Sequence, residues 1–308
     1  MHNNRGKNYL QTLTGLALAI TIIAPPVIAS TEPQGTDVKK LLAYDRSVAF
    51  DLKETSSKEE NGAVIKDVNY AGYTPRHGRI KAYLVRPKGP GPFAGIVFFH
   101  WLGRPKGDRT QFLEEAVALS KQGVASLLIQ GYFPWKEQPA DGPSDRQKII
   151  DQTIEARRAL DLLLFQKGVD RRRIAYVGHD YGAMFGGTMA NVERRVKTYV
   201  LIAGLGTFSD WSLKYWPDTA KQGKEVYERA VKPFDPIIHV AHAAPATVLF
   251  QFANTDHFIT REDAMTFYEK ASQPKEVKFY DAEHDMNVEL ARKDRRDWLT
   301  RQLRLGPG

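Results

Sequence analysis

The sequence predicts an α/β protein, with a mostly parallel sheet covered by helices on both faces. From residue 94 onward, short apolar runs alternate with longer segments of helical periodicity, which is typical of repeated strand–helix units. Residues 94–100 (AGIVFFH) and 124–130 (VASLLIQ) are apolar along almost their whole length, as parallel strands buried on both faces should be. Hydrophobic residues make up 42% and charged residues 26% of the 308-residue chain, close to ordinary globular usage.

The first 29 residues have the order of a secretory signal. Arg5 and Lys7 precede an apolar segment at 10–23, and Val27 and Ala29 occupy the −3 and −1 positions of a cleavage site. The apolar segment is short for a membrane span. We therefore expect a signal peptide at 1–29, export to the periplasm or beyond the cell, and no stable membrane span after cleavage. An uncleaved membrane anchor is the alternative.

The polar segment 30–43 predicts a linker, followed by one domain at 44–308. Strands are expected first at 47–52, 63–70 and 79–85, where short turns indicate an antiparallel beginning of the sheet. The segment 204–245 fits the later alternation poorly and predicts a small insertion over the carboxyl edge of the sheet, where such sheets bind ligands. The remaining expected elements are strands at 94–100, 124–130, 173–178, 196–203, 247–253 and 277–280, and helices at 110–122, 144–167, 261–270 and 288–303.

Composition excludes several classes of function. The formal net charge is +8, but 44 Lys and Arg are scattered among 36 acids and form no basic stripe, so we expect no nucleic-acid partner. The absence of cysteine excludes disulfides, thiolate nucleophiles and Cys-based metal sites. No H-E-x-x-H motif and no phosphate-binding glycine loop is present. We expect a small-molecule substrate and neither a metal nor a cofactor.

The most informative motif is Gly178-His179-Asp180-Tyr181-Gly182, directly between an expected strand and an expected helix. A G-x-S-x-G elbow places its central residue on a sharp, strained turn, with glycines where helix and strand approach closely. Here the central residue is Asp180, and His179 is expected to brace the turn.

Two further residues complete the order nucleophile, acid, histidine. Asp256 follows the strand expected at 247–253, and His284 follows the strand expected at 277–280. Their loops should therefore reach the same sheet edge as Asp180. In this assignment Asp180 attacks carbon, His284 activates water to hydrolyse the resulting ester, and Asp256 orients the imidazole.

The surroundings of these three residues are predicted as well. The backbone N–H groups of Tyr181 and Trp101 are expected to form the oxyanion hole. The candidate substrate contacts, among them possible proton or halide donors, are His100, Tyr132, Trp135, Trp211, Tyr215 and Trp216.

From about Gly78 to Arg304 the chain resembles the dienelactone-hydrolase-like and acyl-esterase branch of the α/β-hydrolase superfamily. The stretches FFHWLG, VASLLIQGYFPW, RIAYVGHDYGAMFGG and KFYDAEH carry the resemblance. It implies an α/β-hydrolase fold and a triad at Asp180, Asp256 and His284. The nucleophile of that family is normally Ser or Cys. His-Asp in the elbow instead resembles epoxide hydrolases and haloalkane dehalogenases, whose helical cap is larger than the insertion expected here.

An aspartate nucleophile favours displacement at a saturated carbon. Attack on an ester carbonyl would give a high-energy mixed anhydride, whereas attack on an epoxide or a carbon–halogen bond gives an ordinary ester. Two other interpretations stay open: an esterase or lactonase in which Asp180 acts as a base for water, and a non-catalytic binding protein built on a degenerate hydrolase fold. Asp210 is an alternative acid, and the alternative histidines are His257, His239 and His242.

Overall fold

The computed structural model describes residues 37–103 and 107–306. The signal peptide expected at 1–29 lies outside these residues. Within the segment expected to be a linker, Val38–Leu41 form the short helix α1, and Leu42 is buried in the hydrophobic core of the domain. In the part of the chain that the structure describes, no helix is long and apolar enough to cross a membrane.

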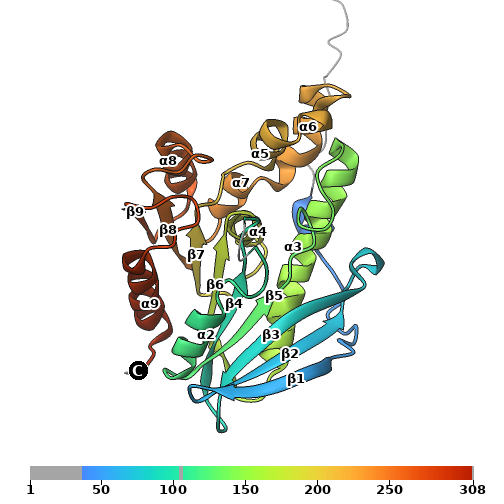
Figure 1. Cartoon of the computed structure of the whole chain (residues 1–308). Coiled ribbons are helices and arrows are strands. Elements are labelled where there is room, and N and C mark those ends of the chain that lie inside the picture. The colour runs from blue at the N-terminus through green and yellow to red at the C-terminus, as the bar shows by residue number, and fades with distance from the viewer. Residues whose placement is uncertain (1–36, 104–106, 307–308) are drawn as a thin grey trace, which may run out of the picture. The chain divides into compact units, whose positions relative to one another are not determined.

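Among the described residues, nine strands form one twisted sheet in the order β1-β2-β3-β5-β4-β6-β7-β8-β9 (Figure 1). The pairs from β1 to β5 are antiparallel, and all pairs from β5 to β9 are parallel, as the sequence predicts. The strands are β1 Lys53–Glu60, β2 Ala63–Ala71, β3 Arg79–Pro87, β4 Phe93–Phe99, β5 Val124–Ile129, β6 Val169–His179, β7 Thr198–Ile202, β8 Thr247–Ala253 and β9 Lys275–Tyr280.

The first strand was predicted in the wrong place. The structure has no strand at 47–52, where Asp51 adopts a left-handed backbone with φ 42°. The strand is instead β1, whose sequence KETSSKEE is exposed at every position. Because neither face of β1 is buried, it shows no apolar alternation, and backbone pairing with β2 holds it in place.

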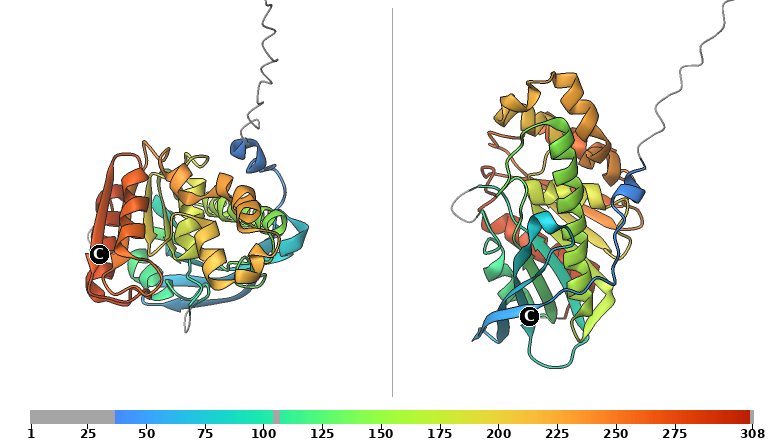
Figure 2. Two further views of the ribbon diagram at one scale, coloured as in Figure 1. Left: turned by 90° about the horizontal axis from the view of Figure 1, so that it is seen from above. Right: turned by 90° about the vertical axis from the view of Figure 1, so that its right-hand side faces the viewer.

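Helices cover both faces of the sheet (Figure 2). The helices α2 (Leu113–Ser120) and α9 (Glu289–Leu303) share one face and are joined by a buried ion pair between Glu115 and Arg295, 2.5 Å apart. The other face carries α3 (Gly142–Phe165), α4 (Tyr181–Met189), α7 (Pro236–Val240) and α8 (Arg261–Lys270), which contact one another in this order. Burial on both sides explains why all residues of β4 and β5 are apolar or small.

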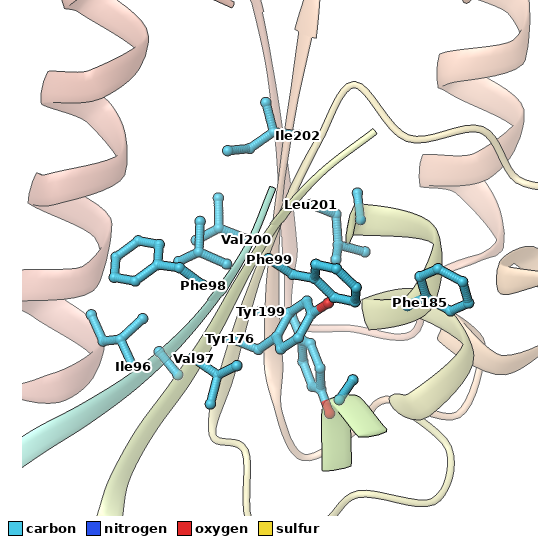
Figure 3. Packing of buried hydrophobic residues seen from close by; sticks show 14 of the residues in the cluster. Ile96, Val97, Phe98, Phe99, Tyr176, Phe185, Tyr199, Val200, Leu201 and Ile202 are labelled. Carbon is cyan, nitrogen blue, oxygen red and sulfur yellow. The ribbon is translucent and has the colours of Figure 1, made fainter. Parts of the chain in front are cut away.

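The core beneath the sheet's carboxyl edge combines aliphatic and aromatic side chains (Figure 3). The ring of Phe99, at the end of β4, stacks on Phe185 of α4 with centroids 5.7 Å apart. Tyr176 of β6 lies 6.0 Å from Tyr199 of β7 in the same cluster. The first contact joins β4 to α4 and the second joins β6 to β7, while the hydroxyl of Tyr176 donates to the carbonyl of Gly182 at 2.6 Å and so ties β6 to α4.

The segment 204–245 forms the insertion that the sequence predicts. It lies over the end of the sheet in Figure 1, between β7 and β8. Its elements are α5 Phe208–Tyr215, the 3-10 turn η2 Pro217–Ala220, α6 Lys224–Val231, the 3-10 turn η3 Lys232–Phe234, and α7.

Candidate active site

Asp180 sits on the strained turn between β6 and α4. Its backbone angles are φ 56° and ψ −120°, a conformation that residues other than glycine rarely adopt. A Cβ on Gly178 would lie 2.2 Å from the carbonyl oxygen of Gly182, and a Cβ on Gly182 would lie 2.3 Å from that of Phe99. Both flanking glycines are therefore required for this close approach, and the turn has the geometry of an elbow.

The structure brings together the three residues that the sequence selects. His284 Nδ1 lies 2.8 Å from Asp256 Oδ2, and His284 Nε2 lies 3.8 Å from Asp180 Oδ1. The second oxygen of Asp256 accepts hydrogen bonds from the backbone N–H groups of Phe258 (2.8 Å) and Ile259 (3.0 Å). Asp256 is thus fixed by its own loop, and it orients the imidazole toward Asp180.

The two oxygens of the Asp180 carboxylate have different surroundings. Oδ2 accepts a hydrogen bond of 2.9 Å from the backbone N–H of Leu102. Oδ1 is buried and has no hydrogen-bond partner among the described residues, and the same holds for the facing Nε2 of His284. The carboxylate therefore has one held oxygen and one free oxygen, and the free one faces the histidine.

The N–H that lies at Asp180 belongs to Leu102 rather than to Trp101, which corrects the predicted oxyanion donor. The N–H of Trp101 donates instead to Gln111 Oε1, at 2.8 Å. The other predicted donor, the N–H of Tyr181 at the start of α4, donates no hydrogen bond to any described residue. Leu102 and Tyr181 thus supply N–H groups from two different loops.

A chain of hydrogen bonds links the loops that follow β4, β6 and β9. Gln111 Nε2 donates to His179 Nδ1 at 2.5 Å, and His179 Nε2 donates to the carbonyl of His284 at 2.8 Å. The ring of Trp101 stacks parallel to that of His179, with centroids 5.2 Å apart. Burial keeps the pKa of His179 well below its ordinary value, so the ring is neutral, as one accepting nitrogen requires. His179 braces the site, as expected.

Charge balance sets the protonation of His284. Burial lowers its pKa, but the hydrogen bond with Asp256 and the negative charges of Asp180 and Asp256 outweigh burial and raise it to about 9. Burial opposes ionisation of Asp256, yet the hydrogen bond from His284 brings its pKa below the ordinary value. At neutral pH the imidazole is therefore charged and lies between two carboxylates.

Two predicted substrate contacts are supports of the loop after β4. His100 is buried, its Nδ1 donates to the carbonyl of Trp101 at 2.8 Å, and its Nε2 accepts the N–H of Gly131 at 2.9 Å. Burial lowers its pKa to about 4, so the ring is neutral. The indole N–H of Trp135 also donates to the carbonyl of Trp101, at 2.8 Å. Neither side chain has a polar atom left for a substrate.

The other predicted aromatics divide into near and distant ones. The ring of Trp211 lies 5.7 Å from that of His284, and Tyr215 lies 5.5 Å from Trp211. Trp216 is one ring further, 6.5 Å from Tyr215. Tyr132 is engaged elsewhere, because its hydroxyl donates to Glu137 at 2.7 Å.

Sequence reasoning missed Phe258. Its ring centroid lies 4.8 Å from that of His284, nearer than any of the predicted aromatics. The available signal was its position, two residues after the acid in the same loop.

The residues considered as an alternative acid or histidine lie apart from Asp180 and His284. Asp210 is exposed and accepts a hydrogen bond from the hydroxyl of Thr207. His257 and His242 are exposed, and His239 Nε2 donates to the carbonyl of Pro233 at 2.8 Å. In the described part of the chain, no group of three or more His, Cys, Asp or Glu side chains is arranged to hold a metal ion.

Comparisons with known proteins agree with this architecture. The acetyl xylan esterase from Paenibacillus sp. R4 has a TM-score of 0.68 and 19% identity, over 86% of this chain and 92% of that one. The acetyl xylan esterase 1 from Thermoanaerobacterium sp. JW/SL YS485 has a TM-score of 0.67 and 17% identity, over 85% and 91%. A glucuronoyl esterase from Solibacter usitatus has 0.62 and 13%, over 87% and 92%. The α/β-hydrolase fold predicted from the sequence is thereby confirmed.

Neither the family models nor the curated protein sequences contain a match to this chain. At these low identities the structural likeness establishes the fold alone. It does not single out the dienelactone-hydrolase branch, so the activity rests on the chemistry of the site.

Proposed function

We propose that the protein is an exported hydrolase that attacks a saturated carbon of a small organic electrophile with Asp180. The observation that carries the proposal is the unequal environment of the two carboxylate oxygens. Oδ2 is held by the N–H of Leu102, while Oδ1 is free and 3.8 Å from His284 Nε2. A carboxylate held in this way presents one oxygen for attack. The signal-like order of residues 1–29 supports export.

In the first step Asp180 Oδ1 forms a bond to the substrate carbon. The bond from that carbon to the leaving group breaks, and the leaving group takes the electron pair. A halide departs as the anion, whereas the oxygen of an opened epoxide takes the proton from His284 Nε2, which faces Asp180 Oδ1. The product is an ester of Asp180, and no general base is needed because the nucleophile is already an anion.

In the second step water hydrolyses the ester. Alkylation removes the negative charge of Asp180, and with it one of the two interactions that raise the pKa of His284. With a halide substrate the imidazolium releases its proton to solvent, and with either substrate the neutral imidazole then accepts a proton from water, which attacks the carbonyl carbon of Asp180. Negative charge develops on the oxygen near the N–H groups of Leu102 and Tyr181. Collapse releases an alcohol or a diol and restores the carboxylate, with one oxygen from water.

The decisive experiment follows the oxygen of the water. The chain from Ser30 onward would be given one equivalent of styrene oxide or of a short haloalkane in ¹⁸O-labelled water. The expected result is label in the peptide that contains Asp180 after one turnover, and label in the product only in later turnovers. Asp180→Asn should give neither turnover nor label. Label directly in the first product would contradict the alkyl-enzyme and assign Asp180 the role of a base.

A second candidate is an esterase or lactonase, which the folds of the similar esterases favour. Nitrophenyl esters and an enol lactone would be assayed in parallel with the electrophiles. Turnover of the esters without turnover of epoxides or haloalkanes would replace the displacement mechanism. The absence of both turnover and adduct across the panel would favour a binding protein.

A further inference from the structure

Aromatic rings surround the imidazole of His284. The ring centroids of Phe258, Trp211 and Trp101 lie 4.8, 5.7 and 6.1 Å from that of His284. Phe258 and Trp211 also stack on each other, 6.1 Å apart with an interplanar angle of 19°. Tyr215 lies 5.6 Å from Phe258. A substrate group that approaches His284 past these side chains therefore contacts the faces and edges of their rings first.

Phe258 is both held and exposed. Its backbone N–H donates to Asp256 Oδ1, and so does that of the buried Ile259, so the chain at this point is tied to the acid. Phe258 is nevertheless 41% exposed as a residue, whereas the neighbouring Trp211 is 4% exposed. A large apolar ring held in water beside a buried histidine is an unfavourable arrangement that an apolar ligand would relieve.

The reacting atoms lie behind these rings. Asp180 Oδ1 and His284 Nε2 are both buried. Of the four described rings in contact with His284, those of Phe258, Trp211, His179 and Trp101, Phe258 is the most exposed, and it belongs to a loop rather than to a helix. A substrate that replaces water on Phe258 therefore also comes next to the imidazole.

We infer that the substrate carries an aromatic ring next to its reacting carbon, as in a benzylic or styryl electrophile, and that Phe258 and Trp211 bind this ring. The inference rests on the proposed function for the identity of the reacting carbon. Binding of the ring, by contrast, does not require that the substrate reacts. Contacts between aromatic rings are more favourable than area burial alone provides, and they favour stacked or edge-on geometries of the kind seen among these side chains.

Binding can be tested without turnover in the Asp180→Asn variant. Benzyl alcohol and cyclohexylmethanol have the same number of carbons and differ in aromaticity. Their dissociation constants would be measured by calorimetry, with tryptophan fluorescence reporting on contact with Trp211. We expect benzyl alcohol to bind about threefold to tenfold more tightly. Equal affinities, or no binding of either alcohol, would overturn the inference.

Phe258→Leu in the same background identifies the recognising ring. It keeps an apolar side chain of similar size, so the fold is retained, and it should abolish the preference for benzyl alcohol. The matched control is Phe165→Leu, because Phe165 is 73% exposed and its ring partner is Phe50 rather than a residue of the site. A preference that survives Phe258→Leu would contradict the role of this ring. Because these measurements need no turnover, their results can be interpreted independently of the labelled-water experiment.

Discussion

Two regions of the molecule place a carboxylate beside a histidine in the interior. One is the site formed by Asp180, His284 and Asp256. The other joins Glu155 of α3 to His77, which belongs to the 3-10 turn η1 (Pro75–His77); His77 Nδ1 lies 3.5 Å from Glu155 Oε1. The side chains of all these histidines and carboxylates are almost entirely buried. Each region also contains polar atoms without hydrogen-bond partners among the described residues.

The surroundings of the two pairs differ. Glu155 Oε1 accepts the backbone N–H groups of Tyr73 (2.7 Å) and Thr74 (3.2 Å), so it holds a loop against α3. Neither ring nitrogen of His77 has a hydrogen-bond partner in the described part of the chain. His284, by contrast, is oriented by a second carboxylate. The two buried carboxylate–imidazole pairs therefore differ in the orienting acid, Asp256, and in the backbone N–H that donates to Asp180.

The largest expected effect is a difference in turnover between variants of the two histidines, His284 and His77. His284→Gln should slow steady-state turnover by about 10² to 10⁴, the usual contribution of a general base, while the ester on Asp180 accumulates. Mass spectrometry of the intact protein would detect the adduct. His77→Gln should leave turnover within about twofold. Rapid turnover by His284→Gln, or an adduct in His77→Gln, would remove the distinction between the two regions.

The second effect is on the pH dependence of stability. The folded protein raises the pKa of His284 from 6.5 to about 9. The stabilisation from this shift is fully present below about pH 6.5 and is lost as the pH rises toward 9. It amounts to about 3 kcal/mol. Urea denaturation between pH 6 and 10 should show this loss, and His284→Gln should flatten the curve. An unchanged slope in the variant would argue against a charged His284.

The third effect is that of replacing Glu155, which should change the stability of the protein but not its turnover. Glu155→Ala leaves the N–H groups of Tyr73 and Thr74 without their acceptor, which should lower the free energy of unfolding by about 1–3 kcal/mol. Turnover per folded molecule should stay the same. Asp180→Asn should instead abolish turnover, and it also removes one of the two charge attractions that stabilise the protonated His284. A selective loss of turnover in Glu155→Ala would give this second region a functional role.

The smallest effect tests the hydrogen-bond chain that reaches His284. Gln111→Leu removes the acceptor of the Trp101 N–H and the donor to His179. We expect hydrolysis of the ester to slow by about tenfold and alkylation to change less, because only hydrolysis uses both His284 and the oxyanion donors. Rapid-quench measurement of the two steps would check this. Gln111 precedes helix α2 and Gln122 follows it. Gln122→Leu is the matched control, because the Gln122 side chain contacts Thr300. Equal slowing in both variants would indicate a general structural effect.

The sequence predicted those features that depend on local composition or chain order. The strand β8 and the helix α8 have the predicted bounds, because buried strands are apolar and the helix begins at a capping threonine, Thr260. The triad followed from its order along the chain and from the convergence of parallel strands at one edge. Strand β1 was placed wrongly because its polar sequence forms a strand only through pairing with β2.

The details of the site depended on contacts that no local pattern reveals. Whether Trp101 or Leu102 offers its N–H to Asp180 is decided by Gln111, which occupies the N–H of Trp101 from ten positions further along the chain. The hydrogen bonds of His100 and Trp135 to the carbonyl of Trp101 likewise depend on contacts between loops that are distant in the sequence.

The exposed strand β1 has a consequence for how copies of the protein behave toward one another. It lies at the open edge of the sheet, where unpaired backbone groups offer a template for a strand of another molecule. Its sequence KETSSKEE places charged side chains along that edge, and a bulge between Glu54 and Ser56 makes the pairing irregular. The same residues that hid this strand from hydrophobic patterning thus oppose aggregation through it.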